Sequence, residues 1–196
     1  MFSGKSSELL KRIETYKITH DSAKMCIIVS KKDTRYGENS IITHNKLSSE
    51  NLNITTFSVI SLKEIEDKLD NFDIIFIDEC QFIDIDFDKN VSTNEEKTTH
   101  HHNNHHRNYL DLLRSKGKKI YVAFLNGNTN RQSFNMQMVS LFEISTDIIF
   151  LKSVCSCDRD ACYTIRIDDK EAIIDVGGAD KYRPVCGRCW DEKNKK

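Results

Sequence analysis

Apolar positions follow two different patterns along the first three quarters of the chain. Amphipathic patterns with helical spacing occupy residues 7–18, 62–69 and 109–117. Apolar runs that are rich in β-branched residues and too short for typical helices occupy residues 24–30, 72–79 (a run that ends in two carboxylates) and 119–125. Such runs predict strands that are buried on both faces, as in parallel sheets. We therefore expect an open α/β fold with a mostly parallel sheet and with ligands at the strand ends.

This pattern stops between Asp88 and Arg107. The stretch is polar, with Ser, Thr, Asn and Glu followed by five histidines among residues 100–106. Its apolar surface is too small to offset the entropy cost of ordering, so we expect a disordered surface insertion. Binding of a transition metal by the histidines is the alternative, although the tract lacks the rigid ligand spacing of such sites.

Composition and net charge limit the kinds of partner and location that we expect for this chain. The chain has 196 residues, 38% of them hydrophobic, and a net charge of -1, and no apolar run is long enough to span a membrane. A charge so close to zero provides no general attraction to nucleic acids or anionic membranes, so we expect neither as a partner. Seven cysteines, an odd number, and the lack of a secretory pattern at the N-terminus favour a reducing, cytoplasmic location.

The first residues match the second half of a phosphate-binding loop, Met1-Phe2-Ser3-Gly4-Lys5-Ser6. In such a loop, backbone N–H groups at the start of a helix bind phosphate oxygens, Lys5 contacts the outer phosphates and Ser6 binds Mg²⁺. The full pattern has a glycine five positions before Gly4. We expect that glycine, and the strand that leads into it, to lie upstream of Met1. A solvated helix N-terminus is the alternative for so short a match.

Charged residues follow two of the predicted strands. Asp33 and Arg35 come after the first, where Arg35 would clamp a transferring phosphoryl group and Asp33 would order Mg²⁺ or Arg35. An exposed ion pair in a loop is the alternative. Asp78 and Glu79 end the next predicted strand, as in a Walker B element, which predicts Asp78 near Mg²⁺ and Glu79 as general base. Capping of a following helix is the alternative for this pair.

Cysteines in the last quarter have the spacing of a zinc site. Cys155 and Cys157 precede Cys186 and Cys189, and two pairs of soft ligands on two turns suit tetrahedral Zn²⁺. The first pair is one residue shorter than the preferred spacing, so Cys162 is an alternative ligand. Four unrelated buried thiols are the alternative to a metal. We expect a structural site without an open coordination position.

Taken together, these motifs resemble those of the zinc-containing thymidine kinases, the type II deoxynucleoside kinases. The matching stretches are residues 1–6 with 8–10, 33–36, 78–82, Arg131 with Phe134, and 177–182 before Cys186. The resemblance implies a P-loop NTPase-like α/β core over residues 1–150, a zinc-bearing lasso domain over residues 151–196, and frequently a homotetramer. It implies ATP-dependent phosphorylation of the thymidine 5′-hydroxyl, with Glu79 as catalytic base.

The resemblance also implies which residues contact each ligand. The residues implied for ATP, phosphate or Mg²⁺ are Met1, Phe2, Ser3, Gly4, Lys5, Ser6, Asp33, Thr34, Arg35, Asp78 and Gln81. Those implied for the nucleoside are Phe82, Thr129, Phe134, Ile173, Ile174, Asp175, Val176, Gly177 and Tyr182. Residues 173–177 and Tyr182 match the lasso, whose backbone surrounds the thymine and the sugar. The implied cofactors are ATP, Mg²⁺ and structural Zn²⁺.

Some residues depart from the family pattern. Thr129 stands where the family has an aromatic residue against the base, which weakens the argument for a thymidine preference over deoxyuridine. Cys80 and Asn135 replace glycines, and Ser133 replaces a proline. Two hypotheses follow: an active nucleoside kinase, or a degenerate relative that keeps the zinc fold and binds nucleotide or a partner chain without catalysis.

Replacement of residues 88–107 by a short turn should leave thermal stability nearly unchanged. The composition of this tract cannot bury a core, and the entropy of closing a loop grows only slowly with loop length. Thermal unfolding of the full and shortened chains measures the difference. A fall in Tm of more than about 4 °C, roughly 1 kcal/mol or more, would show that the tract packs against the fold.

Overall fold

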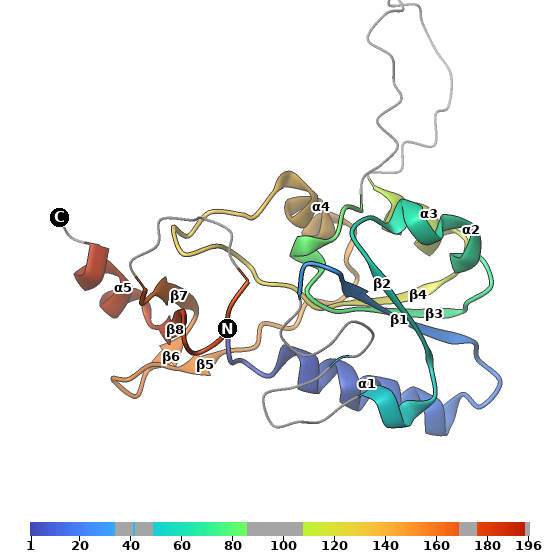
Figure 1. Ribbon diagram of the computed structural model, residues 1–196, viewed down its shortest axis with the longest axis horizontal. Helices are drawn as coiled ribbons and strands as arrows, with labels where there is room; N and C mark the ends of the chain where they lie inside the picture. Colours follow the sequence, from blue (N-terminus) through green and yellow to red (C-terminus); the bar gives the residue numbers. More distant parts are fainter. Residues whose placement is uncertain (34–40, 42–48, 86–107, 169–175, 195–196) are drawn as a thin grey trace, which may run out of the picture.

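The structure, a computed structural model, describes residues 1–33, 41, 49–85, 108–168 and 176–194. Its main sheet has four parallel strands in the order β2-β1-β3-β4 (Figure 1). The strands are β1 (Met25–Ser30), β2 (Thr55–Val59), β3 (Ile74–Ile77) and β4 (Lys119–Val122). The expected α/β fold with a central parallel sheet is confirmed, although the sequence pattern did not predict β2.

Helices cover both faces of this sheet. The helical elements of the first part of the chain are α1 (Lys5–Thr19), η1 (Ser49–Leu52), η2 (Leu62–Ile65), α2 (Glu66–Leu69), η3 (Cys80–Phe82), α3 (Tyr109–Ser115) and α4 (Met136–Ile144). Figure 1 shows α1 below the sheet and α2 and α3 above it. None of the helices in the described ranges is long and apolar enough to cross a membrane.

The alternation of side chains along β1 assigns its residues to two cores. Cys26 and Ile28 belong to the cluster that contains residues of η2, α2, α3 and α4. Ile27 and Val29 belong to the cluster that contains Leu9, Leu10 and Ile13 of α1. Because successive side chains of a strand point to opposite faces, one short apolar run supports both layers of helices.

The helix expected over residues 62–69 is divided into η2 and α2, and a capping box precedes it. The Ser61 side chain accepts a hydrogen bond from the Lys63 N–H, at 3.3 Å. The Glu64 carboxylate accepts from the N–H groups of Ile60 (2.7 Å) and Ser61 (3.0 Å) and from Lys31 Nζ (2.6 Å). The Lys31 contact, followed by the two N–H groups, lowers the pKa of Glu64 to about 2.

Glu64→Gln should lower the stability of the fold modestly at neutral pH and less at acid pH. The folded-state pKa of Glu64 lies below its unfolded value, so its contribution is present above pH 4.5 and is lost as the pH falls towards 2. The carboxylate is partly exposed, and solvent screens its contact with Lys31. Unfolding midpoints measured at pH 7 and pH 3 should therefore differ less for the variant than for the wild type. Equal pH dependence of the two proteins would contradict this role.

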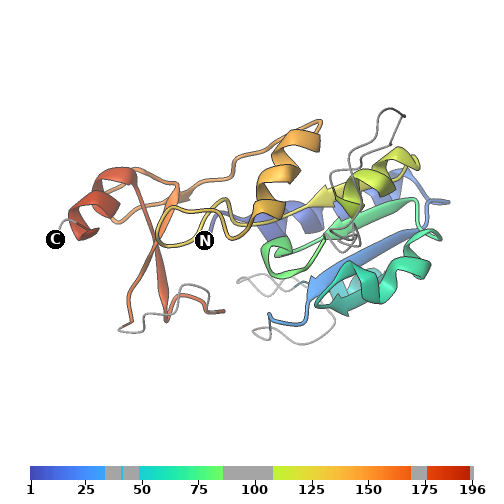
Figure 2. The same ribbon diagram turned by 90° about the horizontal axis from the view of Figure 1, so that it is seen from above.

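The C-terminal part contains two small antiparallel sheets and one helix, seen at the left of Figure 2. β5 (Ser153–Val154) pairs with β6 (Asp160–Ala161), and β7 (Tyr163–Arg166) pairs with β8 (Tyr182–Val185), which leads to α5 (Gly187–Asn194). The insertion expected at residues 88–107 lies outside the described residues. The division of the chain into domains at residue 150 stays a prediction.

Candidate functional site

The carboxyl end of β3 meets the start of α1 through Asp78. Its side chain is 6% exposed, and Oδ2 accepts a 2.7 Å hydrogen bond from Ser6 Oγ. Oδ1 accepts from the N–H of Glu79 at 3.0 Å. Burial and the adjacent Glu79 charge raise the pKa of Asp78 to about 6, although Ser6 and Lys5 act in the opposite direction. The predicted pair Ser6 and Asp78 thus lies in direct contact.

The start of α1 has the geometry of an anion site. Gly4 precedes the helix with a φ of 80°, a left-handed conformation that glycine adopts without the steric cost of a Cβ. Lys5 is the first residue of this 15-residue helix. Unpaired N–H groups in the first turn and the positive end of the helix dipole favour a phosphate there.

Glu79 follows Asp78 in a left-handed conformation, with a φ of 49° and a ψ of 44°. The buried Gln81 side chain donates from Nε2 to Glu79 Oε2, and its Oε1 accepts from the N–H of Leu125 at 3.1 Å. The amide of Gln81 therefore connects the Glu79 carboxylate to the chain that leaves β4. A non-glycine residue in this region stores strain, which is a feature of functional sites.

Glu79 lines a pocket between the sheet and the C-terminal part. Two aromatic rings, Phe82 and Phe134, meet edge to face in its wall, with ring centroids 6.0 Å apart. The remaining lining residues are Met1, Leu125, Gly127, Asn128, Thr129, Thr164, Val176, Gly177 and Tyr182. A carboxylate beside apolar and aromatic walls suits a small ligand that carries a planar ring and a hydroxyl group.

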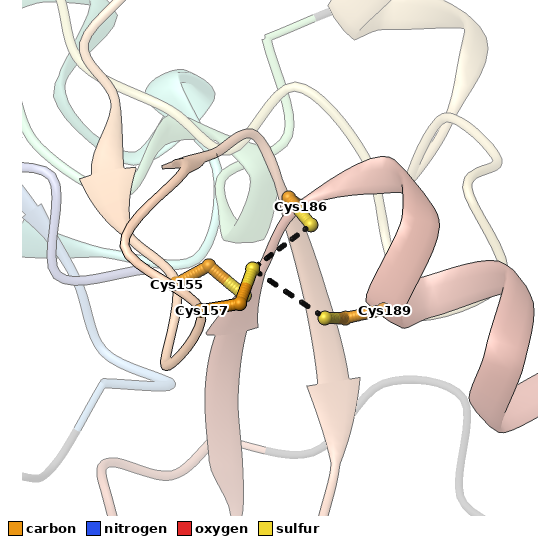
Figure 3. A group of neighbouring side chains, drawn as sticks. All are labelled: Cys155, Cys157, Cys186 and Cys189. Atoms are coloured by element: carbon orange, nitrogen blue, oxygen red, sulfur yellow. Dashed lines mark hydrogen bonds between the residues drawn. The ribbon is translucent and has the colours of Figure 1, made fainter.

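Four cysteines form a second site, in the C-terminal part. Figure 3 shows Cys155 and Cys157 in the turn between β5 and β6, Cys186 after β8, and Cys189 on α5. The Sγ atom of Cys157 lies 3.6 Å from that of Cys186 and 3.7 Å from that of Cys189. All four ligand atoms lie within 4.8 Å of one another. Cys162 is exposed and is not part of this group.

These distances and charges fit a tetrahedral zinc ion. Four thiolates at about 2.3 Å from zinc place their sulfur atoms about 3.8 Å apart, close to the spacing observed here. Backbone N–H groups of Cys157 and Cys186 lower the pKa of Cys155 to about 6. The neighbouring sulfur atoms, Cys157 first, raise the pKa of Cys189 to about 12, and a bound cation would favour the ionised form of all four thiols.

Comparisons with known proteins support a single family. The profile described as thymidine kinase matches residues 1–101 and 99–190. The thymidine kinase of Choristoneura fumiferana entomopoxvirus is 36% identical over 199 residues, which cover 99% of this chain and 94% of that protein. The thymidine kinase of Sheeppox virus (strain KS-1) is 35% identical, over 97% of this chain and 92% of its own. Thymidine kinase 1 of Dictyostelium discoideum is 30% identical, over 97% and 74%.

This chain belongs to the thymidine kinase family. In this thymidine kinase family member, the structure brings together many of the residues that the sequence predicted for one site. Ser6 contacts Asp78, Gln81 contacts Glu79, and a shared pocket is lined by Met1, Glu79, Phe82, Thr129, Phe134, Val176, Gly177 and Tyr182. Phe2 and Ser3 lie in the segment that precedes α1, next to Gly4. Their roles toward ligands stay predictions.

Of the other residues that the sequence predicted for the site, one lies outside the pocket wall and five lie outside the described residues. Asp33 follows β1 and donates its N–H to the carbonyl of Ser30 at 3.0 Å, outside the pocket lining. Thr34, Arg35, Ile173, Ile174 and Asp175 lie outside the described residues.

Sequence reasoning missed part of the pocket wall. Leu125, Gly127 and Asn128 line it from the segment after β4, and Thr164 lines it from β7. The turn formers that follow a predicted strand at residues 126–128 were a signal for the first group. Nothing in the sequence distinguishes Thr164 from its neighbours in β7.

The cysteine cluster allows a matched test of the zinc site. Purified, reduced wild-type protein should contain about one zinc ion per chain, and Cys186→Ser should lose it, because tetrahedral thiolate sites require all four ligands. Cys162→Ser is the control and should keep the metal. Elemental analysis measures both. Zinc loss in the Cys162 variant, or its absence from the wild type, would contradict the assignment.

Proposed function

We propose that this chain phosphorylates the 5′-hydroxyl of thymidine with ATP as the phosphate donor. The observation that carries the proposal is the position of Glu79, whose carboxylate lines an aromatic pocket directly after Asp78, the residue that contacts Ser6. The names of the relatives given above, each a thymidine kinase, support the choice of nucleoside.

In the proposed reaction, the 5′-oxygen forms a bond to the γ-phosphorus of ATP. The bond between that phosphorus and the β,γ-bridging oxygen breaks, ADP leaves, and Glu79 takes the proton of the hydroxyl. We assign Lys5 to the negative charge on the transferring group. Arg35 has the same assignment, from the sequence alone.

Ser6 and Asp78 are the residues that we assign to Mg²⁺. Their hydroxyl and carboxylate oxygens already lie 2.7 Å apart, and hard cations prefer oxygen ligands. When bound, Mg²⁺ would neutralise negative charge on the phosphates.

Phe82 and Phe134 are assigned to the pyrimidine. Their edge-to-face pair offers an aromatic wall within reach of the Glu79 carboxylate in the same pocket. Tyr182 and Gly177 line the same pocket from the C-terminal part, on the segment that matches the lasso. The assignment of Ile173, Ile174 and Asp175 to the nucleoside rests on the resemblance alone.

Glu79→Gln should lower turnover by roughly 10²–10⁴-fold, the usual contribution of a general base, with little change in thymidine affinity. Glutamine keeps the shape and hydrogen bonding of the side chain but removes its basicity.

Lys5→Ala should weaken ATP binding and lower the rate as well, because it removes charge from the phosphate loop. Steady-state kinetics with varied thymidine and ATP separates these effects.

Glu14→Gln is the matched control, since Glu14 is exposed on α1 and is absent from the pocket lining. Near-normal turnover in Glu79→Gln would contradict the assignment of the base. A wild type that binds zinc and ATP but transfers no phosphate would instead support the second hypothesis, a non-catalytic relative.

The homotetramer and the cytoplasmic location stay predictions, and sedimentation analysis tests the first of them.

A further inference from the structure

The side chain of Arg131 holds the pocket loop at residues 126–134 to the C-terminal part. Its guanidinium carbon lies 4.3 Å from the ring centroid of Tyr163 and 4.9 Å from that of Trp190. The two rings come from β7 and α5 respectively. Arg131 also donates to the Tyr163 hydroxyl at 3.4 Å and to Asp191 Oδ1 at 3.2 Å. A planar guanidinium in contact with two aromatic rings gains cation–π and stacking contacts that lysine reproduces only in part.

The backbone of this loop depends on the same contact. Arg131 has a φ of 61°, which a non-glycine residue adopts at a cost. Asn128 closes the turn, with its Oδ1 accepting from the N–H groups of Asn130 (2.9 Å) and Gln132 (3.1 Å). Trp190 adds a second tie, because its Nε1 donates to the carbonyl oxygen of Thr129 at 2.9 Å. The loop is thus a closed turn with Arg131 as its anchor.

Both aromatic partners of Arg131 belong to the small core of the cysteine site. Trp190 directly follows Cys189, and Tyr163 directly follows Cys162. Tyr163, Trp190, Cys157 and Cys189 all pack against the buried cluster that contains Cys155 and Cys186. A metal held by the four sulfur atoms would fix α5 relative to the turn between β5 and β6, and would thereby fix the ring of Trp190.

On its other side, the loop forms the wall of the pocket. Gly127, Asn128, Thr129 and Phe134 line it beside Glu79, together with Thr164 and Tyr182 of the C-terminal sheet. A shift of the turn would therefore move Thr129 and Phe134 away from a bound nucleoside without touching Asp78 or Ser6.

We propose that Arg131 is a positioning residue that couples nucleoside affinity to metal binding at the four cysteines. The inference rests on the proposed function. The path runs from the sulfur atoms through Trp190 and Tyr163 to Arg131, and from there to the pocket wall at Thr129 and Phe134. It predicts an effect on thymidine affinity that is separate from the phosphoryl transfer step.

Trp190 is the only tryptophan of the chain, so its fluorescence reports on this contact directly. In zinc-loaded Arg131→Ala, Trp190 emission should shift to longer wavelength and the Kd and KM for thymidine should rise roughly tenfold, equivalent to about 1.4 kcal/mol. The kcat at saturating thymidine should stay within about twofold of the wild type. Arg131→Lys, which keeps the charge but not the planar group, should lie between the two.

Arg188→Ala is the matched control, because Arg188 lies on the same helix as Trp190, is exposed, and pairs with Glu192 away from the pocket. It should change neither the emission nor the affinity. Zinc content, measured in every variant, should remain at the wild-type value. Removal of zinc from the wild type should weaken thymidine binding and shift Trp190 emission, whereas removal from Arg131→Ala should weaken binding much less.

The outcomes separate this inference from the function on which it rests. A wild type that binds no thymidine contradicts the proposed function. A wild type that binds thymidine, together with an Arg131→Ala variant that binds it equally well, overturns the inference alone. Loss of zinc in Arg131→Ala, or an equal loss of affinity on zinc removal in both proteins, would also overturn it, since Arg131 would then be only structural or outside the path.

Discussion

Strand β3 pairs with β1 at one edge and with β4 at the other, and core side chains cover both of its faces. All four of its residues are buried, so its backbone cannot shift without disturbing two close-packed cores. Asp78 and Glu79 follow this stretch directly. The sheet can therefore hold a buried carboxylate against Ser6, and the desolvation that raises the Asp78 pKa is the electrostatic cost of that rigidity.

The pocket beside β3 has walls that belong to different cores. Glu79 and Phe82 continue from the main sheet, while Thr164 and Tyr182 lie on the small sheet next to the cysteines. The loop at residues 126–134 joins these walls. Affinity for a ligand in such a pocket depends on how firmly the walls are held together, which the packing of either core alone does not determine.

How far the sequence predicts this structure depends on burial. β1, β3 and β4 were predicted because short, continuous apolar runs rich in β-branched residues are typical of buried strands. β2 was missed because Thr55, Thr56 and Ser58 make it a half-exposed strand at the sheet edge. The pattern also missed α4, although Asn135, whose side chain accepts from the Met138 N–H, is a typical helix cap. In the site, the sequence motifs predicted that Ser6 and Asp78 lie at one Mg²⁺ site and that Glu79 lies next to it. The choice between Cys155 and Cys162 was open, because a turn at Asp158 that no spacing rule specifies brings Cys155 inward.

Backbone strain is concentrated in three regions: the residue after Asp78, the pocket loop and the cysteine turn. Among the described residues, five other than glycine have a positive φ, and three of them are Glu79, Arg131 and Asp158. Each is opposed by a specific contact: the Gln81 amide at Glu79, two aromatic rings at Arg131, and the Asp158 N–H donated to the Cys155 carbonyl. A left-handed residue of this kind costs of order 1–3 kcal/mol. Since these contacts hold conformations that the chain would otherwise leave, loss of one should relax the backbone locally. The pocket, its loop and the cysteine turn are therefore the regions where a lost side-chain contact changes geometry before it changes the fold.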